Sequence, residues 1–469
     1  MDSTETLFAR RHEIQVVMLP LPAQGHLNHL LQLSRALSAR GLNVLFVTTS
    51  THINQARHRV QGWDLHNFPI GFHELPMPSF SDQQPDLENK EHTFPVHFIP
   101  LFEALEDLRE PFDRLIQSLD RNRVVIVHDP LLGWVQTVAA KYGAPAYVFN
   151  CFSAYFYAMK EKGLGLPDCV VSSKRCLPLS FLDFKSRQPD YLRLAAGHLM
   201  NTFRALESQF MREDYCEKPL WAVGPLLPQS IWTAKKGSTS SDVESCLRWL
   251  DGQHPASVLY VSFGSASSLS RQQLQELARG LEASQRSFLW VVRVADSARF
   301  TASDEARMDW ISELLPEGYE GRIAGRGFLV RNWAPQLDIL SHKATGGFVT
   351  HCGWNSTLES ISAGVPMVTW PLHSDQFANS ILVARELKVG VEVKKWTKAD
   401  ENELVMAEEV EKAIGRLMAE DGEGLEIRSR AKELGLAARR AVAEGGSSFK
   451  ELESFIHHFT SILDERNND

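Results

Sequence analysis

Apolar runs and helical repeats alternate along the N-terminal part of the chain. The run Ile14–Leu19 predicts a short buried strand, and a turn at Pro20–Gly25 follows it. Leucines then recur at helical spacing over residues 26–41, and Gly41 ends the segment. A second apolar run, Asn43–Thr48, completes a strand–helix–strand unit. Because such a crossover joins parallel strands, the pattern predicts a parallel sheet covered by helices.

The same alternation continues and repeats in the second half of the chain. Further strands are predicted at Arg123–Val127, Ala144–Phe149, Val258–Phe263, Ser287–Val292, Phe328–Val330, Gly347–Thr350 and Met367–Thr369, and helices at Phe94–Leu119 and Arg271–Ala283. Between the halves, Thr233–Val243 is polar and rich in small residues, which is typical of a linker. We therefore predict an α/β protein with two doubly wound domains, residues 1–235 and 249–446, a linker at 236–248 and a C-terminal helix at 447–469.

Composition narrows the class of protein. A chain of 469 residues with 43% hydrophobic and 23% charged residues can fold into two large domains. The net charge of −9 disfavours a general nucleic-acid or anionic-membrane binder, and no apolar run is long enough to span a bilayer. The six cysteines show no CxxC pairing, so we expect neither a zinc site nor a disulfide framework. These features predict a cytoplasmic protein without a metal.

One predicted strand leads directly into a polar turn that suits an anion. The strand Gly347–Thr350 is followed by the turn HCGWNS, and we predict a helix at Thr357–Ser362. The first N–H groups of a helix have no intrahelical acceptor and carry the positive end of the helix dipole. The side chains of His351, Asn355 and Ser356 add further donors. The turn therefore predicts a diphosphate site.

Three features of this region also have simpler explanations. Ser356 and Glu359 have the spacing of a capping box, which would only begin a helix. Trp333 beside a proline can present its indole to a nucleotide base or belong to the core. Asp375 and Gln376 follow a strand and a Trp-Pro turn, where they can bind sugar hydroxyls or remain solvated. The residues alone leave both interpretations open.

A candidate general base and its partner lie in the first domain. His26 stands at the head of the first predicted helix, where the helix dipole disfavours the imidazolium and so favours a base. Asp129 follows the strand RVVIVH, and two parallel strands end at one edge of a sheet, so Asp129 can reach His26 and orient it. Strand alternation turns the neighbouring His128 to the other side. The alternatives are a capping or surface histidine and an Asp-Pro turn.

The segment Trp333–Gln376 resembles the signature of plant UDP-dependent glycosyltransferases, with the core HCGWNS…E…GVP…WP…DQ intact. The similarity extends to PLPAQGHLNHLLQLSRAL, NTFRALE, VGP, SFGS and LPEGY elsewhere in the chain. Within the family, GHLNHLLQLSR, VIVHDPLLG and HSDQFANSILVARELKVG are most similar to zeatin O-glycosyltransferases. The sequence departs from many members at Gln24, where they carry histidine or another residue.

The resemblance implies the GT-B fold, with the acceptor in the first domain, the UDP-sugar in the second, and the C-terminal helix crossing back onto the first. It also implies His26 as the general base and Asp129 as its partner. The implied donor site places uracil on Trp333 and Ala334, ribose at Gln336 and Glu359, the diphosphate at His351, Gly353, Asn355, Ser356 and Ser265, and the sugar at Trp354, Asp375 and Gln376.

The function that the resemblance implies is inverting transfer of a sugar from a UDP-sugar to a hydroxyl of a small apolar acceptor, with a zeatin-type cytokinin as the first candidate. Gln376 is similar to the residue of glucose users, and UDP-xylose stays an alternative donor. No metal is required, because the helix dipole and hydrogen bonds would stabilise the diphosphate. We expect a monomer whose partners are the acceptor and the UDP-sugar only.

Other functions stay open at this stage. A flavonoid or another phenolic compound could be the acceptor, through oxygen or through a ring carbon. Aromatic residues in Pro95–Phe102, Cys151–Tyr157 and Tyr191–Met200 predict an apolar acceptor pocket, although they fit a helix core as well. A non-catalytic UDP-sugar-binding protein and a sugar-nucleotide epimerase are the alternatives from other classes.

Overall fold

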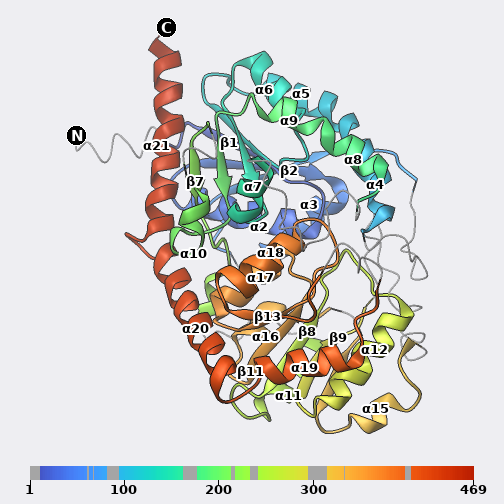
Figure 1. The fold of residues 1–469 in the computed structure, drawn as a ribbon. Coiled ribbons are helices and arrows are strands. Elements are labelled where there is room, and N and C mark those ends of the chain that lie inside the picture. The colour runs from blue at the N-terminus through green and yellow to red at the C-terminus, as the bar shows by residue number, and fades with distance from the viewer. Residues whose placement is uncertain are drawn as a thin grey trace.

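Two parallel sheets, each surrounded by helices, form the computed structural model of the chain (Figure 1). It describes residues 11–60, 63–66, 68–81, 94–161, 177–212, 217–232, 241–293, 314–331, 333–396 and 403–468. The strand order is β3-β2-β1-β4-β5-β6-β7 in the first sheet and β10-β9-β8-β11-β12-β13 in the second. All paired neighbours run parallel, so the predicted pair of doubly wound α/β domains is confirmed.

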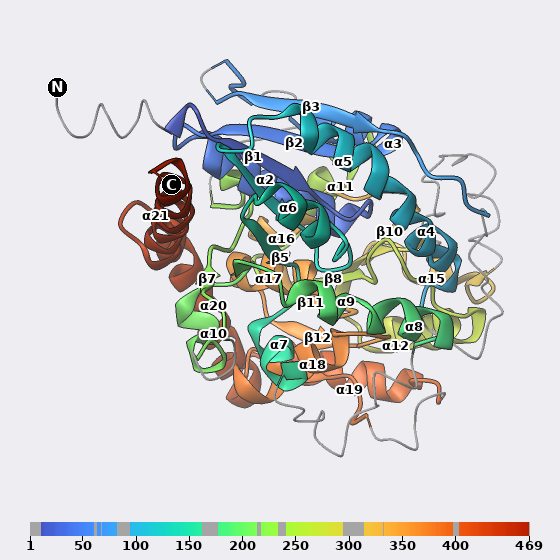
Figure 2. The ribbon, with the colours of Figure 1, turned by 90° about the horizontal axis from the view of Figure 1, so that it is seen from above.

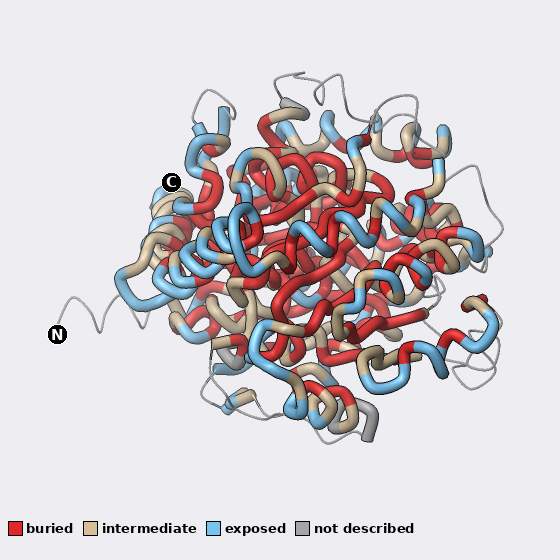
Figure 3. The backbone as a smooth tube through the Cα atoms, turned by 60° about the horizontal axis from the view of Figure 1, so that its bottom comes forward, coloured by how far each residue is buried: buried red, intermediate tan, exposed pale blue. Residues whose placement is uncertain are grey.

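Most strands are short apolar runs buried inside their domains, whereas the edge strands β3 and β10 are only partly buried. The first sheet contains β1 (Gln15–Leu19), β2 (Asn43–Thr49), β3 (Ile70–Leu75), β4 (Val124–His128), β5 (Ala146–Asn150), β6 (Gly197–Met200) and β7 (Leu220–Ala222). The second contains β8 (Val258–Ser262), β9 (Ser287–Val291), β10 (Gly327–Val330), β11 (Thr345–Thr350), β12 (Met367–Thr369) and β13 (Gly390–Glu392). Every residue of β4, β5, β8 and β11 is buried, because helices cover parallel sheets on both faces. Figure 3 shows buried backbone concentrated in the interior and exposed backbone at the periphery.

Helices connect these strands and surround the sheets. Those of the first half are α2 (Gln24–Ser38), α3 (Ser50–Arg59), η1 (Val96–Phe98), α4 (Ile99–Ala104), η2 (Leu105–Leu108), α5 (Arg109–Ser118), α6 (Val135–Tyr142), α7 (Ala154–Glu161), α8 (Leu179–Ser186), α9 (Gln188–Leu192), α10 (Arg204–Glu207) and η3 (Ser208–Phe210). Those of the second half are η5 (Gln229–Trp232), α11 (Ser241–Asp251), α12 (Arg271–Ala283), α15 (Tyr319–Arg322), α16 (Gln336–Ser341), α17 (Trp354–Ala363), α18 (Gln376–Ile381), η6 (Leu382–Glu386), α19 (Ala407–Leu417), α20 (Gly422–Val442) and α21 (Ser447–Asn468). Within the described ranges, no helix has the length and apolarity needed to cross a membrane.

The strand order reverses beside the first strand of each sheet. Strand β1 lies between β2 and β4, and β8 lies between β9 and β11. In open α/β sheets, the crevice beyond the carboxyl ends of the strands at such a reversal is where ligands bind. The segments that follow β1, β4, β8 and β11 are therefore the positions from which a functional site is expected.

Most predicted elements are present, and the differences have local causes. Helix α12 and strand β12 have the predicted bounds, whereas the helix predicted at Phe94–Leu119 is divided into η1, α4, η2 and α5. Helix α11 occupies residues 241–248 of the stretch predicted as a linker, because Cys246 and Leu250 supply a buried face; residues 236–240 lie outside the described residues. The exact division of the chain into domains stays a prediction.

The C-terminal helix α21 packs beside the first sheet, next to β7 (Figures 1 and 2). Phe455 of α21 is fully buried in one apolar cluster with Tyr147 of β5 and Trp221 of β7. The indole Nε1 of Trp221 also donates to the hydroxyl of Ser454 at 3.3 Å. The last helix of the chain therefore contributes to the core built around the N-terminal sheet.

Candidate active site

A cavity of about 1640 Å³ lies between the two sheets, and we refer to it as the interdomain cleft. Each of six strands is followed by a residue that lines it: His26 after β1, Pro130 after β4, Cys151 after β5, Ser265 after β8, His351 after β11 and His373 after β12. Every predicted site residue lines this cleft except Asp129, which is fully buried behind His26. The carboxyl edges of both sheets thus face one space.

The predicted base and its partner are in contact. His26 lies in the first turn of α2, and its Nδ1 is 2.5 Å from Oδ2 of Asp129. The other carboxylate oxygen of Asp129 accepts from the backbone N–H of Leu131 at 2.9 Å. The His26 side chain is 30% exposed, so its ring reaches the cleft while the carboxylate is fully buried. This arrangement fixes the ring and leaves Nε2 available to accept a proton.

Two opposing effects act on the pKa of His26. Burial alone lowers it, because an imidazolium loses hydration. The Asp129 carboxylate and, to a smaller extent, Cys151 attract the imidazolium and hydrogen-bond to it, and the net result is a pKa well above the ordinary value. His26 is therefore a strong base whose neutral form requires a higher pH than that of a free histidine.

His128 does not compete for this role. Its Nδ1 donates to the backbone carbonyl of Asp129 at 2.8 Å, and its Nε2 accepts from Gln136 at 2.8 Å. Burial lowers the pKa of His128 to about 4, so the ring is neutral. Both of its nitrogens are occupied, as expected from its opposite orientation on β4.

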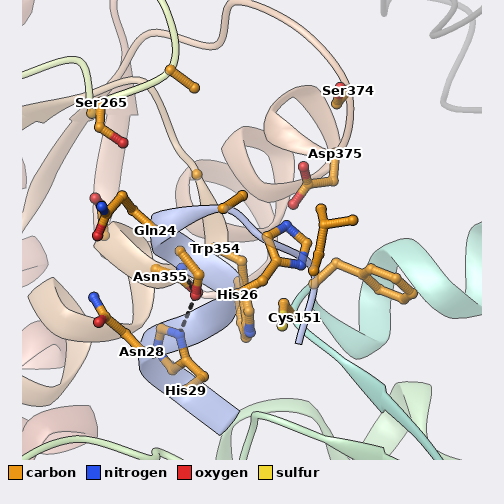
Figure 4. A pocket seen from close by; sticks show the side chains of 18 of the residues that line it. Gln24, His26, Asn28, His29, Cys151, Ser265, Trp354, Asn355, Ser374 and Asp375 are labelled. Atoms are coloured by element: carbon orange, nitrogen blue, oxygen red, sulfur yellow. Dashed lines mark hydrogen bonds between the residues drawn. The ribbon is translucent and has the colours of Figure 1, made fainter. Parts of the chain in front are cut away.

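The two domains meet beside the base. The amide Nδ2 of Asn355 donates to the backbone carbonyl of Gly25 at 2.8 Å, and Nδ1 of His29 donates to the same oxygen at 2.8 Å (Figure 4). A Cβ added at Gly25 would lie 2.6 Å from Nδ2 of Asn355, closer than atoms can pack. Glycine at position 25 thus lets the start of α2 approach the start of α17.

Helix α17 begins three residues earlier than predicted. It starts at Trp354, its N-cap is Gly353, and no side chain caps it. The capping-box interpretation of Ser356 and Glu359 is therefore wrong, because Ser356 lies inside the helix. The first backbone N–H groups of α17 consequently have no helical acceptor at the wall of the cleft. This end of α17 is suited to an anionic group.

Two polar atoms near this helix start are buried without a partner among the described residues. They are Nδ1 of His351 and Oδ1 of Asn355. Burial lowers the pKa of His351 to about 4, so its ring is neutral and offers one N–H donor. Buried polar atoms are normally paired, so these two indicate a place where a polar ligand binds.

A network of polar side chains lies next to the helix. The amide Nε2 of Gln336 donates to Ser356 Oγ at 3.0 Å and to Glu359 Oε2 at 2.6 Å. The hydroxyl of Tyr260 donates to Oε1 of Gln336 at 3.2 Å. Burial raises the pKa of Glu359 to about 7, although the Gln336 bond opposes the shift. Such a carboxyl group can accept hydrogen bonds from vicinal hydroxyls when it is ionised and can donate one to them when it is protonated.

Trp333 is on the surface of the cleft and not in the core. Its side chain is 61% exposed, whereas the next residue, Ala334, is buried. An exposed indole at the rim of a cleft presents a flat face on which a nucleotide base can stack. The core interpretation of Trp333 is therefore wrong.

Asp375 and Gln376 are held firmly at the start of α18, as its N-cap and its first residue. Oδ2 of Asp375 accepts from Nδ2 of Asn379 at 2.8 Å, and burial raises the pKa of Asp375. Oε1 of Gln376 accepts from the backbone N–H groups of Leu372 and His373 at 2.8 and 3.0 Å. The pair is thus part of an ordered wall of the cleft rather than a solvated turn. Trp354 is buried, and its Nε1 donates to the Asn201 carbonyl at 2.8 Å.

Asn379 contacts the cleft-lining Asp375 and was not predicted from the sequence. Its side chain is fully buried, and its Nδ2 also donates to the Cys352 carbonyl at 2.9 Å. Its Oδ1 accepts from the hydroxyl of Ser153, in the loop before α7, at 2.8 Å. Asn379 therefore links Asp375 to the opposite domain. Only its position four residues after Asp375, on the same helical face, could have suggested this role.

Phenylalanines form an apolar part of the cleft in the first domain. They are Phe94, Phe98, Phe102, Phe152, Phe156 and Phe181. The rings of Phe94 and Phe181 lie 4.5 Å apart between centroids, and those of Phe102 and Phe181 lie 5.5 Å apart. Two of the three predicted acceptor segments, Pro95–Phe102 and Cys151–Tyr157, contribute to this surface, while Tyr191–Met200 contributes Leu192, Arg193 and His198. An apolar, flat ligand fits it.

A buried carboxyl group holds α7, the helix that carries Phe156. Glu207, the last residue of the NTFRALE segment, is fully buried. Its two oxygens accept from the backbone N–H groups of Ala154 and Tyr155 at 3.1 and 2.9 Å, at the start of α7. Burial raises the pKa of Glu207 to about 7. This contact fixes α7 against α10.

Comparison with known proteins places the chain in a family. Residues 12–228 match the family described as "Glycosyltransferase, N-terminal domain", and residues 225–413 match "UDP-glucoronosyl and UDP-glucosyl transferase". The chain is 42% identical to zeatin O-glucosyltransferase of Phaseolus lunatus and 42% identical to zeatin O-xylosyltransferase of Phaseolus vulgaris, in each case over 96% of this chain and 98% of the relative. It resembles the structure of Glycyrrhiza uralensis UGT73P12 with a TM-score of 0.80, 30% identity and 97% of both chains covered.

Two parallel-sheet domains facing one cleft define a glycosyltransferase of the GT-B fold. The chain belongs to the plant UDP-dependent glycosyltransferases, enzymes that transfer a sugar from a UDP-sugar to small molecules. The predicted family, fold and enzyme class are thereby confirmed.

Proposed function

We propose that this enzyme transfers a sugar, with inversion, from a UDP-sugar to a hydroxyl of a small apolar acceptor such as a zeatin-type cytokinin. The observation that carries the proposal is the contact between His26 and Asp129, because His26 lines the same cleft as the start of α17. The base belongs to one domain and the anion-binding helix to the other, so an acceptor and a donor can meet between them.

The proposed reaction uses the two sides of the cleft differently. His26 accepts the proton of the acceptor hydroxyl through Nε2 while the oxygen attacks the anomeric carbon of the sugar. Asp129 stabilises the imidazolium that forms. UDP departs from the opposite face of the sugar, so an α-linked donor gives a β-linked product. The backbone N–H groups of Trp354 and Asn355, together with His351 and Ser356, stabilise the charge that grows on the diphosphate.

The donor fits the polar wall of the second domain. Trp333 and Ala334 would hold uracil, Gln336 and Glu359 the ribose, and His351, Gly353, Asn355, Ser356 and Ser265 the diphosphate. Trp354, Asp375 and Gln376 would contact the sugar, Trp354 through its backbone because its indole N–H is already bonded. We favour glucose because of Gln376, with xylose as the second candidate, since the relatives named above include a xylosyltransferase.

The acceptor is proposed from two independent features. The 42% identical relatives are named as zeatin glycosyltransferases, and the phenylalanine-lined part of the cleft suits a flat purine with an apolar side chain. The same surface would accept a flavonoid or another phenolic compound, by O- or C-glycosylation. Cytoplasmic location and a monomeric state stay predictions from the sequence.

A mass-spectrometric screen tests the proposal. UDP-glucose and UDP-xylose are each incubated with trans-zeatin, cis-zeatin and flavonoids, and the products are identified by mass and by linkage. We expect a β-O-glucoside of a zeatin as the main product. Conversion of UDP-glucose without an acceptor would instead indicate an epimerase, and UDP-sugar binding without conversion would indicate a non-catalytic protein.

Replacing Trp333 tests the base-stacking role. Trp333→Ala is expected to weaken UDP binding by about 1–3 kcal/mol, the usual contribution of one base–aromatic stack. The fold should be unaffected because the side chain is 61% exposed. Isothermal titration with UDP measures the effect, and Trp333→Phe is the control that keeps a ring. Unchanged UDP affinity in Trp333→Ala would contradict the assignment.

Replacing Asn379 tests the orientation of Asp375. Asn379→Ala leaves the Asp375 carboxylate without its 2.8 Å donor, so we expect the KM for UDP-glucose to rise about tenfold, or about 1.4 kcal/mol. The affinity for UDP, which has no sugar, should stay the same. Equal losses for UDP and UDP-glucose would show that the variant disturbs the whole donor site.

A further inference from the structure

Cys151 lies beside the base and has no part in the proposed mechanism. It directly follows β5, lines the cleft and is half-buried. Figure 4 shows its sulfur next to the ring of His26. One ligand atom each of His26, Asp129 and Cys151 lies within 4.8 Å of the others. Three different metal-ligating groups therefore meet where the acceptor hydroxyl would react.

We infer that His26, Asp129 and Cys151 form a binding site for a thiophilic divalent cation such as Zn²⁺. Imidazole nitrogen, carboxylate oxygen and thiolate sulfur are the three ligand types that zinc prefers. Three protein ligands leave one tetrahedral position for water, as in sites that are open to solvent. Two ligand atoms of a tetrahedral zinc lie about 3.3–3.7 Å apart. Binding through Nδ1 would therefore move His26 and Asp129 apart from their 2.5 Å contact, and the Cys151 sulfur, already within 4.8 Å, would complete the set.

The surroundings favour an ion that enters from the cleft. Cys151 and His26 are both partly exposed there, whereas the carboxylate of Asp129 is anchored from behind by the Leu131 N–H. The other two cysteines among the described residues, Cys246 and Cys352, are buried and do not line the cleft. Binding converts the Cys151 thiol to a thiolate and displaces the ring proton from the ligating nitrogen, so protons are released to solvent.

Binding of the cation does not depend on the proposed function. Its effect on catalysis does, because that effect assumes that His26 is the general base. An ion on Nε2 of His26 would occupy the lone pair that accepts the proton. An ion on Nδ1 would replace the hydrogen bond to Asp129 and leave the remaining ring proton on Nε2. Either geometry removes the base, so Zn²⁺ acts as a reversible inhibitor at this site and not as a cofactor.

Cobalt titration tests the site without an activity assay. Chelator-treated, full-length protein is titrated with Co²⁺, whose bond to a thiolate gives a charge-transfer absorption in the near ultraviolet. We expect one equivalent to bind and Zn²⁺ to displace it. Cys151→Ser should abolish the absorption, and His26→Gln should weaken binding at least about tenfold, the loss typical when even an outer partner of a zinc ligand is removed. Cys246→Ala is the matched control and should titrate like the wild type.

Three results would overturn the inference: no saturable Co²⁺ binding, an absorption that survives in Cys151→Ser, or an absorption that is lost in Cys246→Ala. UDP titration of each variant shows that the donor site is folded, and Cys151→Ala provides a second variant without the thiol. In a sugar-transfer assay, the Zn²⁺ concentration that halves the activity should be at least about tenfold lower for the wild type than for Cys151→Ser. A protein without transferase activity that still binds Co²⁺ through Cys151 would reject the proposed function and keep this site.

Discussion

Replacing His26 with alanine is expected to lower kcat by about 10²- to 10⁴-fold, the usual contribution of a general base. The acceptor hydroxyl would then have to lose its proton to water while it attacks the sugar. UDP binding should persist, because the residues proposed to hold UDP belong to the second domain. A normal UDP affinity combined with a large loss of kcat would assign His26 to the chemical step.

Single-turnover kinetics and UDP calorimetry on the same preparation measure both quantities. His254→Ala is a suitable control, since His254 is exposed and does not line the cleft. Turnover in His26→Ala close to that of the wild type would refute the base assignment. Loss of UDP binding together with turnover would show instead that His26 supports the contact between the domains, which passes through the neighbouring Gly25.

Replacing Asp129 with asparagine is expected to lower kcat by about 10²- to 10⁴-fold and to change its pH dependence. In the wild type, Asp129 outweighs the effect of burial and holds the pKa of His26 well above its ordinary value. The ring accepts a proton only when neutral, so the activity of the wild type should fall as the pH drops through this raised pKa. Without the carboxylate, the largest contribution that favours the imidazolium is lost, so the pKa of His26 falls.

In Asp129→Asn, the acid limb of the pH profile should therefore move to lower pH. The maximum activity of the variant should also be lower than that of the wild type. The measurement is kcat/KM between about pH 5 and 10, because this ratio reports ionisations of the free enzyme. Thermal unfolding of both proteins establishes that the variant is folded. An acid limb that stays in place, or moves to higher pH, would contradict the proposed role of Asp129.

The sequence predicted the fold because most central strands of the two parallel sheets are continuous apolar runs with a turn at the end. Val258–Ser262 and Met367–Thr369 are recognisable in this way, since their burial depends only on residues within the run. Strands β3, β6, β7 and β13 were not predicted; polar residues or glycines interrupt the apolar run in β3, β6 and β13, and β7 has only three residues. Ser241–Asp251 was missed because it begins with polar residues, and its buried face becomes evident only in the packed structure.

For the site, the chain order already brought His26 and Asp129 to one edge of one sheet, because β1 and β4 are parallel neighbours. The polar turn after β11 was also predicted from the sequence, because an apolar run is followed directly by polar residues and a glycine. Ser356 and Glu359 were ambiguous because the same spacing serves a helix cap and a polar cleft wall. The position of Gly353 as the N-cap settled which of the two applies.

By itself, the sequence determined most of the central strands of both sheets, several of their helices, and the edge of the sheet at which the polar residues His26, Asp129 and His351 emerge. Only the tertiary structure decided the contacts between domains: Asn355 with Gly25, 330 positions apart, and Asn379 with Ser153, 226 positions apart. It also brought Cys151 to His26. The periodicity of a helix or strand indicates which of its faces packs against its own domain core. Contacts between the two domains depend instead on how the folded domains dock, which a local sequence pattern does not contain.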